Sequence, residues 1–79
     1  GLTLEGVLSS GGMEEHLVEQ ITLRSALERL PERERQVLVL RYYRSLTQTQ
    51  TAKVLGVSQV QVSRLERRAV DRLRQMLTG

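Results

Sequence analysis

The chain has 79 residues and a formal net charge of +3, with no Cys, one His, no Phe, no Trp and two Tyr. This composition excludes disulfides, thiol catalysis and Cys-based zinc sites, and it leaves little material for a large aromatic-lined ligand pocket. The length suits one small domain, and no signal peptide or apolar stretch of roughly 20 residues is present. We therefore expect a cytoplasmic protein with no membrane partner and no small-molecule substrate.

The positive charge is concentrated in the second half of the chain. Residues 1–40 contain four Arg against seven Glu, a net charge of −3, whereas residues 41–79 contain eight basic against two acidic residues, a net charge of +6. A basic block of this kind attracts polyanions, most often nucleic acid. Charge alone does not decide the matter, because a solvated helix face has the same composition.

Residues 1–12 differ in composition from the rest. Their apolar residues fit one side of a helical turn, but Gly6 interrupts it and the sequence SSGG that follows is typical of a flexible linker. We expect a flexible N-terminal segment over residues 1–12, followed by a domain over residues 13–79. Two origins of this segment remain open, a tag remnant or partner peptide joined by an engineered linker, and a native inter-domain linker.

The next two segments have the pattern of amphipathic helices. Between Glu14 and about Arg29, Leu23 and Leu27, together with Leu30 just beyond, follow the i, i+4, i+7 spacing of one helix face. Pro31 disfavours helix at the residue before it and suits the first turn of a new helix, so a second helix begins near it. The run VLVL in PERERQVLVLRYYR also fits a short strand, but its flanks are strong helix formers and favour a helix.

Two further helices and a tight turn are predicted over residues 47–77. Thr47 and Gln50 form an S/T-x-x-E/Q capping box, and Ser58 and Gln61 repeat it. Between them Gly56 lies where a left-handed backbone is needed. A turn of about three to four residues between two capped helices is typical of a helix-turn-helix. The fold class is therefore all-α, a small three- to four-helix domain containing a helix-turn-helix.

The last helix, from Ser58 to about Leu77, has two unlike faces. Its length of about 30 Å, at roughly 1.5 Å per residue, means that only its first turns can lie in a major groove about 12 Å wide. The rest should pack on the domain. The apolar residues recur at spacings of three and four, and they are Val62, Leu65, Ala69, Leu73 and Met76.

The side chains at the start of this helix are of the kinds that read base edges. Gln pairs with adenine, Arg pairs with guanine, and Val contacts the methyl group of thymine. An ordinary soluble helix surface is the alternative, and the two capping boxes around Gly56 favour DNA reading over it. The candidates are Gln59, Val60, Gln61, Ser63 and Arg64.

The chain resembles region 4, the C-terminal region of bacterial sigma-70 family initiation factors, over roughly residues 14–78. The resemblance rests on LPERERQVLVLRYY and LTQTQTAKVLGVSQVQVSRLERRAVDRLRQML, and SQVQVSRLE is similar to the sporulation and general-stress branch. It implies a compact helical domain. Separately, we expect no cofactor and, with no Cys and one His, no metal site. Such a domain docks on the flap of the RNA polymerase β subunit and recognises the promoter −35 element in double-stranded DNA. Motif alignment then implies base contacts at Gln59, Val60, Gln61 and Arg64, and phosphate contacts at Arg41, Thr47, Gln48, Ser63 and Arg67.

One residue departs from the pattern of this family. The position before Ala52 usually carries Ile or Val, and here it is Thr51. A buried hydroxyl costs stability unless it finds an acceptor, such as the backbone carbonyl one turn back. The departure bears on the packing of that helix and not on the resemblance.

Three alternatives are weighed against this interpretation. A response-regulator-type DNA-binding domain shares the helix pair but normally carries a TVxxH-like sequence, which VSRLERRAVDRLR does not match. A sigma domain used chiefly for protein interaction, with an anti-sigma factor or the β flap, is compatible with the resemblance. An enzyme is not expected, because the lone His16 and nine scattered carboxylates assemble no nucleophile, metal site or acid/base cluster.

Overall fold

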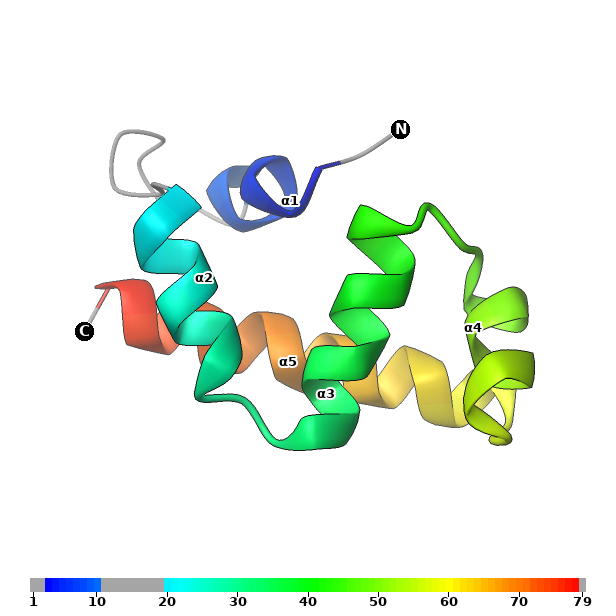
Figure 1. The fold of residues 1–79 in the computed structure, drawn as a ribbon. Helices are drawn as coiled ribbons and strands as arrows, with labels where there is room; N and C mark the ends of the chain where they lie inside the picture. Colours follow the sequence, from blue (N-terminus) through cyan, green and yellow to red (C-terminus); the bar gives the residue numbers. More distant parts are fainter. Residues whose placement is uncertain (1–2, 11–19, 79) are drawn as a thin grey trace.

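The computed structural model of the chain describes residues 3–10 and 20–78, and every regular element within them is helical (Figure 1). This confirms the all-α class. Of the helix expected from Glu14 to about Arg29, residues 14–19 lie outside the described part. In chain order the elements are α1 (Leu4–Ser10), α2 (Gln20–Glu28), α3 (Glu32–Leu38), the π-helical segment η2 (Val39–Tyr43), α4 (Gln48–Leu55) and α5 (Gln59–Thr78).

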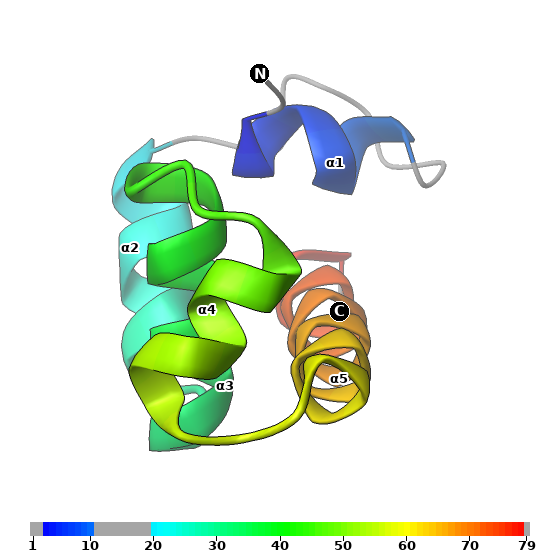
Figure 2. The same ribbon diagram turned by 90° about the vertical axis from the view of Figure 1, so that its right-hand side faces the viewer.

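Helix α5 is the element against which the others pack. Helix α4 contacts it near its N-terminal end, α3 crosses it near the middle, and α2 lies toward its C-terminal end (Figure 1). With α5 seen end-on, α2, α3 and α4 form a layer along one side of it, and α1 lies across the top (Figure 2). None of the helices in the described residues is long and apolar enough to cross a membrane.

The core consists of two clusters, and α5 contributes to both. Val62 packs with Val37 and Ala52 in the smaller cluster, between α3, α4 and the start of α5. The apolar stripe is confirmed, since three of its members are buried and the other two are half-buried. Val70 is also buried, so the apolar face is wider than the stripe. The larger cluster contains Leu4, Leu8, Leu23, Ala26, Leu27, Leu30, Leu38, Ala69, Val70 and Leu73.

Helix α1 is the main difference from the sequence-based expectation, which was a flexible segment over residues 1–12. Leu4 and Leu8, one turn apart and therefore on one face, are both fully buried in the larger cluster. The Arg74 guanidinium also donates a hydrogen bond of 3.1 Å to the Val7 carbonyl oxygen. Over these residues the segment is therefore part of the domain's packing.

The helix-turn-helix signals are present as predicted. The backbone N–H of Gln50 donates to the Thr47 hydroxyl at 3.0 Å, and the N–H of Thr47 donates to Gln50 Oε1 at 2.9 Å. Ser58 and Gln61 form the same reciprocal pair at 3.1 and 3.0 Å. Gly56 has φ 71° and ψ 33°, the left-handed conformation that glycine adopts without steric cost. Both caps and the turn between them are thus confirmed.

Thr51 does not find the backbone acceptor that its buried hydroxyl requires. The residue is fully buried, and its Oγ1 has no hydrogen-bond partner among the described residues. The carbonyl oxygen of Thr47, one turn back, instead accepts the backbone N–H of Thr51 at 2.9 Å. The family departure at this position therefore leaves an unsatisfied polar group buried on α4.

Between α3 and α4 the chain departs from regular α-helix. The N–H of Arg44 donates to the Val39 carbonyl at 3.0 Å, five residues back, which is the hydrogen bond of a π-helix. Ser45 follows with a positive φ of 58°, uncommon for a residue other than glycine. The sequence predicted a helix here and was right in that respect. Within this segment the adjacent Arg41 and Tyr42 both form hydrogen bonds with Glu66 of α5.

Candidate nucleic-acid interface

The base-reading surface is the set of four side chains predicted to contact bases, and all four are exposed on the first two turns of α5. Val60 is 53% exposed, whereas Val62, two positions on, is 0% exposed. An exposed Val with no packing role is available to a thymine methyl group. The four residues are Gln59, Val60, Gln61 and Arg64.

Gln61 serves the helix cap as well as this surface. Its Oε1 accepts the backbone N–H of Ser58, so the carbonyl end of the side chain is already used. A Gln that pairs bidentately with adenine needs both its carbonyl oxygen and its amide nitrogen. In this conformation Gln61 therefore offers DNA only the donors of its amide nitrogen.

A hydrogen bond joins Gln59, which is predicted to contact a base, to Gln48, which is predicted to contact a phosphate. Gln59 Nε2 donates to Gln48 Oε1 at 2.6 Å. Gln48 Nε2 in turn donates to Glu66 Oε1 at 3.2 Å. The first residues of α4 and α5 are thereby joined by their side chains, on the side of the domain where both helices begin (Figure 2).

The five predicted phosphate-contacting residues fall into different environments. Arg67 is exposed on α5, Ser63 is half-buried, and the Thr47 hydroxyl accepts the capping hydrogen bond. Gln48 is half-buried between its two partners. Arg41 differs most, because Nε donates to Glu66 at 2.8 Å and Nη1 donates to the Leu46 carbonyl at 2.8 Å. A phosphate contact by Arg41 would have to use its remaining N–H groups.

Glu66 is the residue that the sequence reasoning missed. Its side chain is 12% exposed, and its carboxylate accepts hydrogen bonds from Arg41 at 2.8 Å, Tyr42 at 2.7 Å and Gln48 at 3.2 Å. One signal was available, since Glu66 and Asp71 are the only acidic residues among the eight basic ones of residues 41–79. A carboxylate in a strongly basic segment is a candidate for a structural role.

Burial and hydrogen bonding act in opposite directions on the carboxyl group of Glu66. Burial disfavours its charged form, but the hydrogen bonds from Arg41, Tyr42 and Gln48 outweigh burial and hold its pKa below the ordinary value. For Tyr42, burial, the hydrogen bond to Glu66 and the charge of Glu66 raise the pKa of the hydroxyl to about 12. The Arg41 guanidinium also lies 5.6 Å from the centre of the Tyr42 ring. The Glu66 carboxylate is therefore charged at neutral pH and is held by hydrogen bonds from three side chains.

The arginines of α5 divide into two groups along the helix. Arg72 pairs with Glu34 of α3. The Nε atom of Arg72 lies 3.0 Å from Oε1 of Glu34 and donates a hydrogen bond of 3.3 Å to Oε2. Arg74 lies 3.8 Å from Asp71. The more N-terminal arginines have no ion pair within the described part of the chain, and they are Arg64, Arg67 and Arg68. Positive charge is thus left uncompensated beside the base-reading surface.

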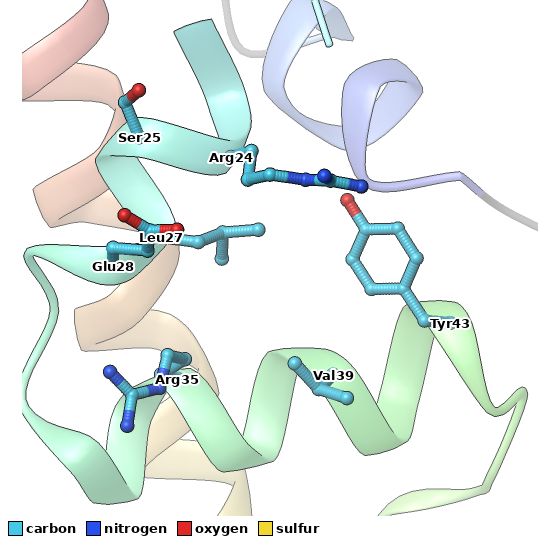
Figure 3. A pocket seen from close by; sticks show the side chains of 7 residues that line it. All are labelled: Arg24, Ser25, Leu27, Glu28, Arg35, Val39 and Tyr43. Atoms are coloured by element: carbon cyan, nitrogen blue, oxygen red, sulfur yellow. The ribbon is translucent and has the colours of Figure 1, made fainter. Parts of the chain in front are cut away.

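A hollow of about 710 Å³ lies elsewhere on the molecule, between α2, α3 and η2 (Figure 3). The side chains of Arg24 and Tyr43 reach toward each other from opposite sides of it. Burial and the charge of Glu5 raise the pKa of Tyr43, while the Arg24 charge opposes the shift. None of the predicted site residues lines the hollow, which is formed by Arg24, Ser25, Leu27, Glu28, Arg35, Val39 and Tyr43.

Metal ligands were not predicted from the sequence. Across residues 3–10 and 20–78 the structure has no group of three or more His, Asp or Glu side chains placed to hold an ion.

Comparison with known proteins identifies the family. The family Sigma-70, region 4 matches residues 26–75, from within α2 to near the end of α5. The RNA polymerase sigma factor SigF of Mycobacterium tuberculosis is 58% identical over 55 residues, which are 70% of this chain and 21% of that protein.

Two relatives from Bacillus subtilis extend the match. The RNA polymerase sigma-F factor is 44% identical over 61 residues, 77% of this chain and 24% of that protein. The RNA polymerase sigma-B factor is 43% identical over 63 residues, 80% of this chain and 24% of that protein. The chain therefore spans less than a quarter of the length of each of these three relatives. It belongs to the sigma-70 family as a region 4 domain of the sporulation and stress branch.

Proposed function

We propose that this domain recognises the −35 element of bacterial promoters as part of RNA polymerase holoenzyme, in the cytoplasm. The observation that carries the proposal is the division of α5 between Val60, which is exposed, and Val62, which is buried. The buried side fixes the helix on the domain, and the exposed side presents the four residues of the base-reading surface. The first turns of α5 enter the major groove, as the second helix of a helix-turn-helix does.

Electrostatics support the same assignment. Arg64, Arg67 and Arg68 are exposed and have no ion pair within the described residues, so their charge is available to phosphates. Phosphate contacts fix the position of the helix, and base contacts provide the sequence preference. In this division Arg64 contacts a base and Arg67 contacts a phosphate.

We expect the RNA polymerase flap to bind a face of the domain that does not contact DNA. We assign the β-subunit flap to the hollow between α2, α3 and η2, because apolar Leu27 and Val39 lie there beside the cationic Arg24 and Arg35. An anti-sigma factor would compete with the flap for this hollow or with DNA for the base-reading surface. The response-regulator alternative has no support from the family match or from the three sigma relatives.

The test is a selection of duplexes randomised over the −35 element, followed by titration of the chain with the selected and the scrambled duplex. Arg64→Ala should weaken binding to the selected duplex by about 1–3 kcal/mol and relax the preference at one base pair. Arg67→Ala, one helical turn away, should weaken both duplexes equally and reduce the salt dependence. Equal losses on both duplexes for Arg64→Ala, or a selection without any base preference, would contradict base reading.

A further inference from the structure

We propose that Glu66 is a positioning residue of the base-reading surface. It holds Gln48, and through Gln48 the side chain of Gln59, so that the base preference at the pair facing Gln59 depends on a carboxylate that does not touch DNA. This inference rests on the proposed function. The inference extends the proposed function by assigning a role in base specificity to Glu66, which lies outside the base-reading surface.

The first step is that the carboxylate itself is immobile. Arg41 and Tyr42 of η2 donate to its two oxygens at 2.8 and 2.7 Å. Arg41 is held in turn by its bond of 2.8 Å to the Leu46 carbonyl. With a side chain that is only 12% exposed, Glu66 has a fixed position relative to the start of α4.

The second step is that an ionised carboxylate determines which way the next side chain points. A carboxylate only accepts hydrogen bonds, so the neighbouring Gln48 must turn its amide nitrogen toward Glu66 and its oxygen away. That oxygen lies 2.6 Å from Nε2 of Gln59, which must therefore turn its own nitrogen inward. The orientation of two amide groups thus follows from the acceptor oxygen that Glu66 presents to Gln48.

The consequence for recognition concerns the atoms that Gln59 presents to DNA. With one N–H engaged by Gln48, the carbonyl oxygen and the second N–H of Gln59 remain available for a base. A Gln free to rotate by 180° offers either end in either place, and it discriminates less between bases. The chain of hydrogen bonds Glu66, Gln48, Gln59 removes this freedom before DNA is bound.

A second carboxylate that pairs with an arginine provides the comparison. Glu34 of α3 is buried, whereas Glu66 is half-buried, and Glu34 pairs with Arg72 of α5 at 3.0 Å. No hydrogen bond within the described residues connects Glu34 to the base-reading surface. Loss of Glu34 is therefore expected to lower stability and leave base preference unchanged, which makes it a matched control.

The experiment measures relative affinities of the 79-residue chain for duplexes that differ at one base pair of the selected element. Gln59→Ala first identifies the pair that Gln59 faces. Gln48→Met should then reduce the discrimination between bases at that pair about five-fold or more, and it leaves Arg41 and Tyr42 in contact with Glu66. Glu66→Leu should reduce the same discrimination to a similar extent. Discrimination at the other pairs should remain. In the Gln59→Ala background, neither substitution should change the preference further.

Three comparisons keep the proposal falsifiable. Glu66→Gln retains an acceptor oxygen where Arg41 and Gln48 donate, so it should restore the preference that Glu66→Leu loses, whereas Glu34→Leu should not alter it. Nuclear magnetic resonance of the free chain should show the side-chain N–H signals of Gln59 shifted in Gln48→Met and unshifted in Glu34→Leu. Unchanged discrimination in Gln48→Met, or unchanged Gln59 signals, would overturn the inference while leaving DNA recognition intact. A wild-type chain without base preference would overturn both proposals.

Discussion

The hydroxyl of Tyr42 donates a hydrogen bond of 2.7 Å to a carboxylate oxygen of Glu66, 24 residues further along the chain. A hydrogen bond to a charged acceptor is shorter and stronger than one between neutral groups. This one joins the π-helical segment η2 to the middle of α5. It helps to hold the scaffold on which the first turn of α4 and the first turn of α5 are placed side by side.

This contact makes the ionisation of Tyr42 depend on the fold. Its pKa, raised from 10.0 to about 12, lies above the unfolded value, so its contribution to stability is fully present below pH 10 and is lost as pH rises toward 12. An absorbance titration of tyrosinate should therefore show one ionisation near pH 12. Tyr42→Phe should remove it, and Tyr43→Phe should leave it. Titration of both tyrosines at the ordinary value would contradict the contact.

The orientation of α5 predicts that the same substitution has different effects on stability at two nearby positions. Val62→Ala removes two buried methyl groups and should lower the free energy of unfolding by about 2 kcal/mol. Val60→Ala makes the same change at a 53% exposed site and should leave stability unchanged or slightly higher, since Ala is the better helix former. Denaturant unfolding monitored by circular dichroism measures both. Equal effects would mean that α5 is rotated from the orientation described.

The unsatisfied hydroxyl of Thr51 predicts a stabilising substitution. Thr51→Val keeps the shape of the side chain and replaces the hydroxyl with a methyl group, so it should raise the free energy of unfolding by about 1 kcal/mol. Thr49→Val, on the exposed side of the same helix, is the control and should have little effect. A loss of stability in Thr51→Val would show that the hydroxyl has a partner that compensates its burial.

The docked position of α1 predicts that its leucines stabilise the domain. A seven-residue helix is not stable by itself in water, so α1 depends on the burial of Leu4 and Leu8. Leu8→Ala should lower the free energy of unfolding by about 2 kcal/mol and speed hydrogen exchange of the α1 amides. Val54→Ala, at an exposed site, serves as control. An unchanged melting curve for Leu8→Ala would favour the flexible segment expected from composition.

Features that depend on neighbouring residues were predicted from the sequence. Thr47 with Gln50, Ser58 with Gln61, and Gly56 between them act within three residues of one another, and all adopt the predicted geometry. The spacing of apolar residues also gave the buried side of α5. These signals sufficed for the fold class and for the position of the base-reading surface on an exposed face.

Features that depend on distant residues were not predicted. Glu66 obtains its role from Arg41, Tyr42 and Gln48, which lie 25, 24 and 18 residues away, so no local pattern reports it. The π-helical conformation of the segment that carries Arg41 and Tyr42 was likewise not indicated by the sequence pattern. For α1, the sequence indicated that the leucines fit one side of a helical turn, but it did not indicate that they pack with residues of α2 and α5.

The two faces of α5 place neighbouring positions under different selective constraints. Val62 cannot change without disturbing the packing of three helices, whereas Val60 contacts nothing that the fold requires. Val60 can therefore be substituted while the domain keeps its stability and its architecture. Under the proposed function, base preference at this position can therefore change without a loss of stability.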